Sequence, residues 1–120
     1  MENMSHSIQS DLNRYKEGVG LYTKKMPDIV SGYNAFTESC FKEGDISQKN
    51  KQLIALGISV YAQDEYCIIY HTKGCLDQGC SEQEIFEAIG VAAALGGGGA
   101  MSQGVTLVQE CIQQLGQQIQ

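Results

Sequence analysis

A single proline among 120 residues restricts how this chain can fold more than any other sequence feature. Proline interrupts helices and marks turns, so a β sandwich of this length would need several, together with Asn-Gly turns. Pro27 stands alone, and apolar residues recur three and four positions apart on both sides of it. With 42% hydrophobic residues the chain can form one core. We therefore predict an all-α fold of about six helices in one domain, residues 1–120.

The apolar pattern predicts individual helices. Helices are expected at residues 27–43, 47–62 and 65–78, after an amphipathic segment that runs from Ile8 to Val19. The segments 47–62 and 65–78 are nearly all apolar around their circumference, so we expect them at the centre of the fold. A last amphipathic segment extends from Met101 to Leu115.

Caps and glycines mark the ends of these helices. Gly18 and Gly20 weaken the end of the first segment, and Gly79 suits the left-handed position after a helix. Ser81-Glu82-Gln83-Glu84 reads as a capping box that opens a helix. The run Gly96 to Gly99 follows a helix and lacks the Gly-Lys-Ser/Thr of a nucleotide loop, so a tight helix junction is the simpler interpretation.

Charge and termini limit the partners. The net charge is −6, and residues 52–120 carry 1 basic and 7 acidic groups, which argues against nucleic acid as a partner. No apolar run approaches the roughly 18 residues of a membrane span. Residues 1–7 are polar, lack the pattern of a signal peptide and are expected to be flexible. We expect a cytoplasmic protein with no membrane partner, whose five cysteines are free thiols.

One predicted helix carries a stripe of chemically capable side chains. Asp64, Cys67, His71 and Cys75 are spaced by 3, 4 and 4 residues, which places them on one helical face. An imidazole one turn away can take the proton of a thiol, and the helix N-terminus favours a thiolate, so both effects would lower the pKa of Cys67. A buried Cys–His pair without function is the alternative. Four ligands on one straight helix rarely surround zinc, so no metal and no cofactor are expected.

The other candidates have structural explanations. Lys73 could steer an anionic substrate, although a solvated lysine is the simpler interpretation. Packing explains three tyrosines near the stripe, Tyr61, Tyr66 and Tyr70. Apolar stripes or a staple explain three cysteines, Cys40, Cys80 and Cys111.

Residues 51–104 resemble the core of the carboxymuconolactone decarboxylase family, in particular its alkylhydroperoxidase D-like (AhpD-like) branch. The resemblance covers 54 of 120 residues. It is carried by Tyr-Cys-Ile-Ile-Tyr-His-Thr-Lys, which begins at Tyr66, and by Gly-Cys-Ser-Glu-Gln-Glu-Ile-Phe-Glu-Ala-Ile, which begins at Gly79. These segments are similar to the family's Cys-x-x-x-His helix and to the turn and helix that follow it.

The resemblance implies roles for four residues. Cys67 falls on the cysteine that attacks peroxide, and His71 falls on the family histidine. Asp64 replaces the first cysteine of the usual Cys-x-x-Cys, and Gln52 replaces a proton-relay glutamate. An oxidised Cys67 would then need another thiol to resolve it, and an ionised Asp64 would raise the pKa of Cys67. A disulfide from Cys67 to Cys75 would have to span about 12 Å of intact helix, which is too far.

Three functions remain open at this point. The first is a thiol-dependent peroxidase of the peroxiredoxin type, an antioxidant oxidoreductase with Cys67 as nucleophile, His71 as base and a thiol reductant as partner. The second is a decarboxylase acting on a carboxylated lactone through His71 and Asp64, with Lys73 as a further base. The third is a non-catalytic protein that keeps the fold. The family resemblance also implies a homo-oligomer, a trimer or more specifically a hexamer.

Overall fold

The computed structural model describes residues 7–119, and side chains up to residue 116. Helices α1 to α5 are followed by a final rod in which a π-helical turn, η1, separates α6 from α7. No strand occurs in this part of the chain. The all-α prediction is therefore confirmed, with six helical rods. The elements are α1 (Ile8–Lys25), α2 (Pro27–Phe41), α3 (Gln48–Ala62), α4 (Glu65–Asp77), α5 (Glu82–Gly96), α6 (Gly98–Gln103), η1 (Gly104–Val108) and α7 (Gln109–Ile119).

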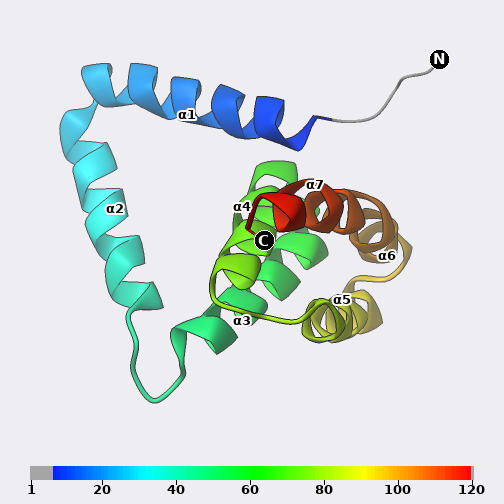
Figure 1. The fold of residues 1–120 in the computed structure, drawn as a ribbon. Coiled ribbons are helices and arrows are strands. Elements are labelled where there is room, and N and C mark those ends of the chain that lie inside the picture. The colour runs from blue at the N-terminus through cyan, green and yellow to red at the C-terminus, as the bar shows by residue number, and fades with distance from the viewer. Residues whose placement is uncertain (1–6, 120) are drawn as a thin grey trace.

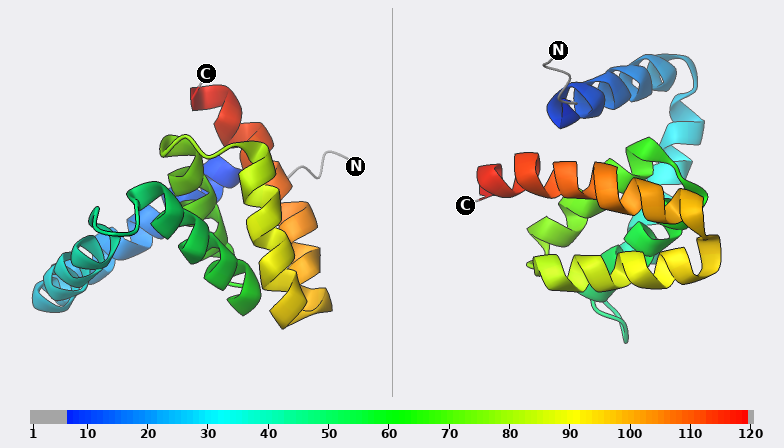
Figure 2. Two further views of the ribbon diagram at one scale, coloured as in Figure 1. Left: turned by 90° about the horizontal axis from the view of Figure 1, so that it is seen from below. Right: turned by 90° about the vertical axis from the view of Figure 1, so that its right-hand side faces the viewer.

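Helices α3 to α7 form the body of the molecule, and α1 and α2 form an arm beside it (Figures 1 and 2). Helix α3 packs against both α4 and α5, and α4 also packs against α7. The core lies between these helices and includes Leu56 and Val60 of α3 and Ile68 and Ile69 of α4, each at most 1% exposed. Helices α3 and α4 are thus as central as their apolar sequences predicted.

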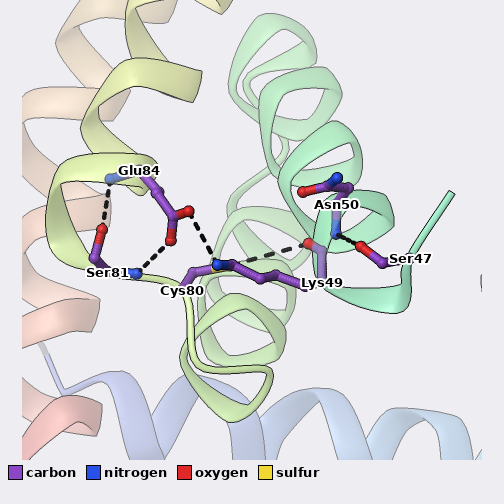
Figure 3. A network of polar contacts seen from close by, with 6 residues as sticks. All are labelled: Ser47, Lys49, Asn50, Cys80, Ser81 and Glu84. Carbon is purple, nitrogen blue, oxygen red and sulfur yellow. Dashed lines mark hydrogen bonds and ion pairs between the residues drawn. The ribbon is translucent and has the colours of Figure 1, made fainter.

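Local side-chain chemistry fixes the start of α5, as the sequence predicted. The Ser81 hydroxyl accepts from Glu84 N at 3.0 Å, and the Glu84 carboxylate accepts from Ser81 N at 2.8 Å (Figure 3). These two bonds satisfy backbone donors that an open helix end would leave without partners. Gly79, with φ of 81°, ends α4 in the left-handed region, and Ser47 caps α3 through Asn50 N at 3.1 Å.

The arm differs from the sequence-based expectation in two ways. Helix α1 continues past Gly18 and Gly20 to Lys25, because neither glycine breaks the backbone hydrogen-bonding of the helix. Helix α2 ends at Phe41 instead of residue 43, because Lys42 is extended. Although α2 carries an apolar stripe, none of its residues is buried.

The glycine run is a tight helix junction, as predicted. Gly97 has φ of 76°, a conformation that L side chains rarely adopt, and it turns the chain from α5 into α6. A Cβ on Gly96 would lie 3.0 Å from the Tyr61 ring, and one on Gly99 would overlap the Gln63 side chain. Glycine therefore lets α3 approach this junction closely. Within the described residues, no helix is both long enough and apolar enough to cross a bilayer.

Candidate functional site

Helix α4 begins with the residues that the sequence analysis singled out. Asp64 is its N-cap, and the carboxylate oxygen Oδ1 accepts from Cys67 N at 3.2 Å. Cys67 is exposed in the first turn, and His71 follows one turn later, partly buried. The cap explains why Asp64 stands immediately beside the Cys67 thiol: its side chain must fold back over the first turn to reach the backbone N–H.

His71 is held by Gln52 of α3. The Nδ1 atom of His71 lies 3.0 Å from Oε1 of Gln52. An amide oxygen only accepts, so Nδ1 carries the proton and Nε2 keeps its lone pair. The Gln52 side chain fits beside Gly74, where a Cβ would overlap the amide. Residues 52 and 71, which the sequence analysis connected only through the family resemblance, are therefore in direct contact.

Aromatic rings enclose the imidazole of His71. Phe41 stacks on it with ring centroids 5.5 Å apart and planes 12° apart, and Tyr70 meets it edge-on at 5.8 Å. Burial lowers the pKa of His71 below its ordinary value, because desolvation penalises the imidazolium form. The site therefore holds a neutral imidazole near pH 7.

The Cys67 thiol has a raised pKa, so the predicted shift toward thiolate is wrong. Desolvation in the site raises the pKa most, and the Asp64 carboxylate raises it further through its charge and a hydrogen bond. The helix N-terminus does favour an anion, but the carboxylate that caps the helix already occupies that position. Desolvation and the Asp64 charge together therefore outweigh the helix dipole.

Cys67, His71 and Gln52 line one cavity of about 330 Å³ between the arm and the body. Helix α1 contributes Tyr15, whose ring lies 5.6 Å from that of Tyr66. Helix α2 contributes the opposite wall. The lining residues are Tyr15, Tyr33, Asn34, Thr37, Glu38, Phe41, Gln52, Tyr66, Cys67, Tyr70 and His71.

The wall from α1 and α2 is the part of the site that sequence reasoning missed. The apolar stripe of the helix at 27–43 was a signal, but it was used only to predict the helix. Tyr33 and Phe41 of that stripe instead face the cavity. Tyr66 and Tyr70, which were assigned to packing, also line it, whereas Tyr61 lies in a separate groove between α3 and α5.

The predicted stripe does not extend to Cys75. That residue is fully buried in the core, while Cys67 is exposed, because eight residues at about 100° each leave the two positions about 80° apart around the helix axis. Lys73 forms an ion pair with Asp77 at 2.9 Å and does not line the cavity. Among the described residues, no group of three or more His, Cys, Asp or Glu side chains could hold a metal ion.

The remaining cysteines lie outside the cavity. Cys111 is fully buried and Cys80 is 7% exposed, so both are packed against the core as predicted. Cys40 is exposed on α2, so its predicted packing role is wrong for the chain taken by itself. In the described part of the chain, Cys67 is the one cysteine that lines the cavity.

Comparison with known proteins identifies the family of this chain. The model of the carboxymuconolactone decarboxylase family matches residues 27–110, a longer stretch than the predicted core at 51–104. The chain therefore belongs to the carboxymuconolactone decarboxylase family. Its AhpD-like features, the Cys-x-x-x-His helix and the capped turn after it, are consistent with that assignment.

Two bacterial proteins are similar to this chain in sequence. An uncharacterised protein of the cox locus of Paracoccus denitrificans is 35% identical over 72 residues, which span 60% of this chain and 65% of that protein, slightly less than two thirds of its length. An uncharacterised protein of Cupriavidus necator is 22% identical over 99 residues, or 82% and 88% of the two chains.

Two solved structures share the fold. A carboxymuconolactone decarboxylase family protein from Legionella pneumophila superimposes with a TM-score of 0.87 at 22% identity, covering 92% of this chain and 99% of that one. A family protein from Thermotoga maritima, for which involvement in an antioxidative response has been suggested, gives a TM-score of 0.73 at 22% identity, covering 88% and 95%.

Proposed function

We propose that the cavity between the arm and the body reduces hydroperoxides, with Cys67 as the nucleophile and His71 as its base. The observation that carries this proposal is that Cys67 and a neutral His71, oriented by Gln52, line the same cavity. A thiol attacks only as its thiolate, so a base is needed wherever the thiol pKa is high. The suggested antioxidative role of the Thermotoga maritima relative supports the same class of reaction.

The chemistry uses the lone pair of His71 Nε2. The imidazole takes the Cys67 proton, and the thiolate attacks one oxygen of the hydroperoxide. The O–O bond breaks, the proton on His71 goes to the departing alkoxide or hydroxide, and Cys67 becomes a sulfenic acid. One molecule of an external thiol condenses with the sulfenic acid and releases water, and a second thiol restores Cys67 while forming a disulfide.

The reductant must come from outside the cavity. Position 64 holds the N-cap carboxylate in place of the usual first cysteine, and Cys67 is the one described cysteine of the cavity. A thiol pool such as that of the cytoplasm would supply the reductant, which fits the expected location of the protein. Because the pKa of Cys67 is raised, the thiolate fraction, and with it the turnover, should increase with pH above neutrality.

The lining favours an uncharged hydroperoxide over a carboxylated lactone. Among the described residues that line the cavity, Glu38 is the one carboxylate. No Lys or Arg is among these lining residues. A multiply charged carboxylate would need a cation to balance its desolvation. Lys73, considered only as an alternative candidate for steering an anionic substrate, is paired with Asp77.

The decisive experiment is consumption of hydrogen peroxide and of an uncharged organic hydroperoxide by the purified protein with dithiothreitol. Cys67→Ser and His71→Ala should each remove most of the turnover, and Cys40→Ser, which changes an exposed cysteine outside the cavity, should leave it unchanged. If the unmodified protein consumes neither peroxide, or if Cys67→Ser retains full turnover, the peroxidase proposal is wrong.

A second function is favoured by the high thiol pKa together with the neutral imidazole. In it, His71 Nε2 abstracts a proton from a carbon acid, and Cys67 is incidental. Turnover of a lactone or other carbon acid that survives in Cys67→Ala but is lost in His71→Ala would identify this function. A protein that shows neither activity and whose Cys67 alkylates slowly at neutral pH would match the non-catalytic alternative.

We also propose that the chain works as a homo-oligomer, a trimer or a hexamer. Large apolar side chains remain exposed on α3 and α5, including Ile58 at 63% and Leu95 at 76%. Such contiguous apolar surface is typical of subunit interfaces. Light scattering after gel filtration should give a multiple of 13.1 kDa. Ile58→Asp should reduce the measured mass, while Ile46→Asp, in the α2–α3 loop, should leave it unchanged. A monomeric unmodified protein would contradict the proposal.

A further inference from the structure

Two thiols outside the cavity meet at the end of α4. Cys80 N donates to the carbonyl oxygen of Cys75 at 2.9 Å, and Gly79 N donates to that of Leu76 at 3.0 Å. With Gly79 in the left-handed region, these two bonds define a Schellman motif. The motif brings together the side chains three positions before and two positions after the cap, and here both are cysteines.

The backbone bond sets a limit on the distance between the two cysteines. The carbonyl oxygen of Cys75 lies about 2.4 Å from the Cα of Cys75, and the amide nitrogen of Cys80 lies about 1.5 Å from the Cα of Cys80. With the 2.9 Å hydrogen bond between these two atoms, the two Cα atoms are at most about 6.8 Å apart. Disulfides span Cα distances of roughly 4.4 to 6.8 Å. The two thiols are also close enough to shift each other's pKa. A disulfide therefore fits this corner with little backbone movement.

The two thiols differ in their surroundings. Cys75 is fully buried, whereas Cys80 is 7% exposed at the junction with α3, with its Sγ 4.0 Å from the carbonyl oxygen of Lys49 (Figure 3). Burial raises the pKa of both thiols, but for Cys80 the neighbouring Cys75 thiol and the Lys49 charge offset part of the increase. Cys80 is thus the thiol that would react first with an oxidant.

We propose that Cys75 and Cys80 are a redox-sensitive pair that closes into an intrachain disulfide when the protein meets a hydroperoxide. The Cys80 sulfur attacks one peroxide oxygen, the O–O bond breaks, and an alcohol or water leaves with the thiol proton. The resulting Cys80 sulfenic acid is attacked by the Cys75 sulfur, and its S–O bond breaks to release water with the Cys75 proton. One hydroperoxide is reduced by two electrons, and two thiols are oxidised.

The disulfide would tie α4 to the start of α5. The loop it closes contains the turn at Gly79, and the capping box at Ser81 begins immediately after it. Exchange of the amide hydrogens in residues 78–84 should slow in the oxidised protein, because opening this corner would require the closed ring to distort. The pair does not use Cys67, so this proposal stands apart from the proposed peroxidase activity.

The test is a thiol map of the full-length protein after oxidation. The reduced protein is treated with excess hydrogen peroxide, blocked with N-ethylmaleimide, unfolded and digested, and the disulfides are read by mass spectrometry with and without dithiothreitol. A dithiothreitol-sensitive link between Cys75 and Cys80 is expected. The link should persist in Cys67→Ala, which separates it from the chemistry of the cavity.

Two variants sharpen the result. Cys80→Ala should abolish the link, whereas Cys111→Ala, which changes another buried cysteine, should leave it in place. If the unmodified protein yields both Cys75 and Cys80 as free thiols after Cys67 has been fully oxidised, the proposal is overturned. A link from either cysteine to a different partner, or oxidation of Cys80 to the sulfinic acid without a link, would also overturn it.

Discussion

The Gln52 side chain occupies the space that a Cβ at position 74 would fill, so Gly74 is what allows Gln52 to reach His71. Glycine in the middle of a helix normally costs stability relative to alanine. Its presence at this position in α4 is explained by the path of the Gln52 side chain, which crosses from α3 to the imidazole.

Gly74→Ala should therefore displace Gln52. The added methyl group must push the amide aside, which the flexible end of the Gln52 side chain can do at little cost, so the free energy of unfolding should change by less than about 1 kcal/mol. The Nδ1–H tautomer of His71 should lose its dominance, which nitrogen chemical shifts of the imidazole would detect. Gly90→Ala is the matched control, because a Cβ at Gly90 of α5 meets nothing within 4 Å. Equal effects of the two variants would contradict this account.

Asp64→Asn should make Cys67 more reactive. The carboxylate charge raises the Cys67 pKa, and asparagine removes the charge while keeping an N-cap acceptor. The rate of Cys67 alkylation by iodoacetamide near neutral pH should increase, with little change in stability. Asp64→Ala removes the cap as well and should cost about 1 kcal/mol. Glu65→Gln serves as the charge control; if it accelerates alkylation as much as Asp64→Asn, the specific role of Asp64 is wrong.

Gln52→Glu should raise the pKa of His71. A carboxylate in place of the amide would stabilise the imidazolium, opposing the burial that lowers the pKa in the unmodified protein. A pH titration of the His71 ring signals by NMR checks the direction. Gln113→Glu, on the exposed side of α7, adds the same charge away from the site and should leave the titration unchanged.

Stability should fall on mild acidification because of His71. Its pKa is lower in the folded than in the unfolded chain, so the unfolded state binds more protons below the ordinary value of 6.5. This contribution is present above pH 6.5 and is lost as the pH falls through the folded-state pKa. The free energy of unfolding in urea, compared at about pH 7.5 and about pH 5.5, should drop more for the unmodified protein than for His71→Phe. Equal drops would contradict this assignment.

The ends of the capped helices could be predicted from the sequence because their causes are local. Ser81 and Glu84 bond to each other's backbone, and Gly79 adopts its conformation through its own lack of a side chain. The centrality of α3 and α4 could be predicted for a similar reason, since their apolar faces leave few other placements. The contact between Gln52 and His71 could be anticipated only from the family resemblance, because periodicity does not show which side chains meet between helices.

The cavity wall and the thiol pKa could not be predicted. Tyr15 and Phe41 reach the site through the path of the arm, which depends on how α1 and α2 lie beside the body. The sequence predicted that the helix N-terminus, His71 and Asp64 lie near Cys67. It did not show which of their effects on the Cys67 pKa is strongest. Desolvation of the thiol in the cavity is the largest cause of the raised pKa, and the cap adds to it because it brings the Asp64 carboxylate onto the turn that holds the thiol.

Helix α2 supplies one wall of the cavity and yet buries none of its own residues. Substitutions at exposed positions usually change the free energy of unfolding by no more than about 0.5 kcal/mol. Residues such as Tyr33 and Asn34 could therefore be exchanged during evolution with little penalty to folding. Cys67, His71 and Gln52 are attached to the core helices instead. The fold thus separates α2, which would determine which molecule the cavity accepts, from the core helices, which would carry out the reaction. The residues of α2 can diversify while those on the core helices are kept.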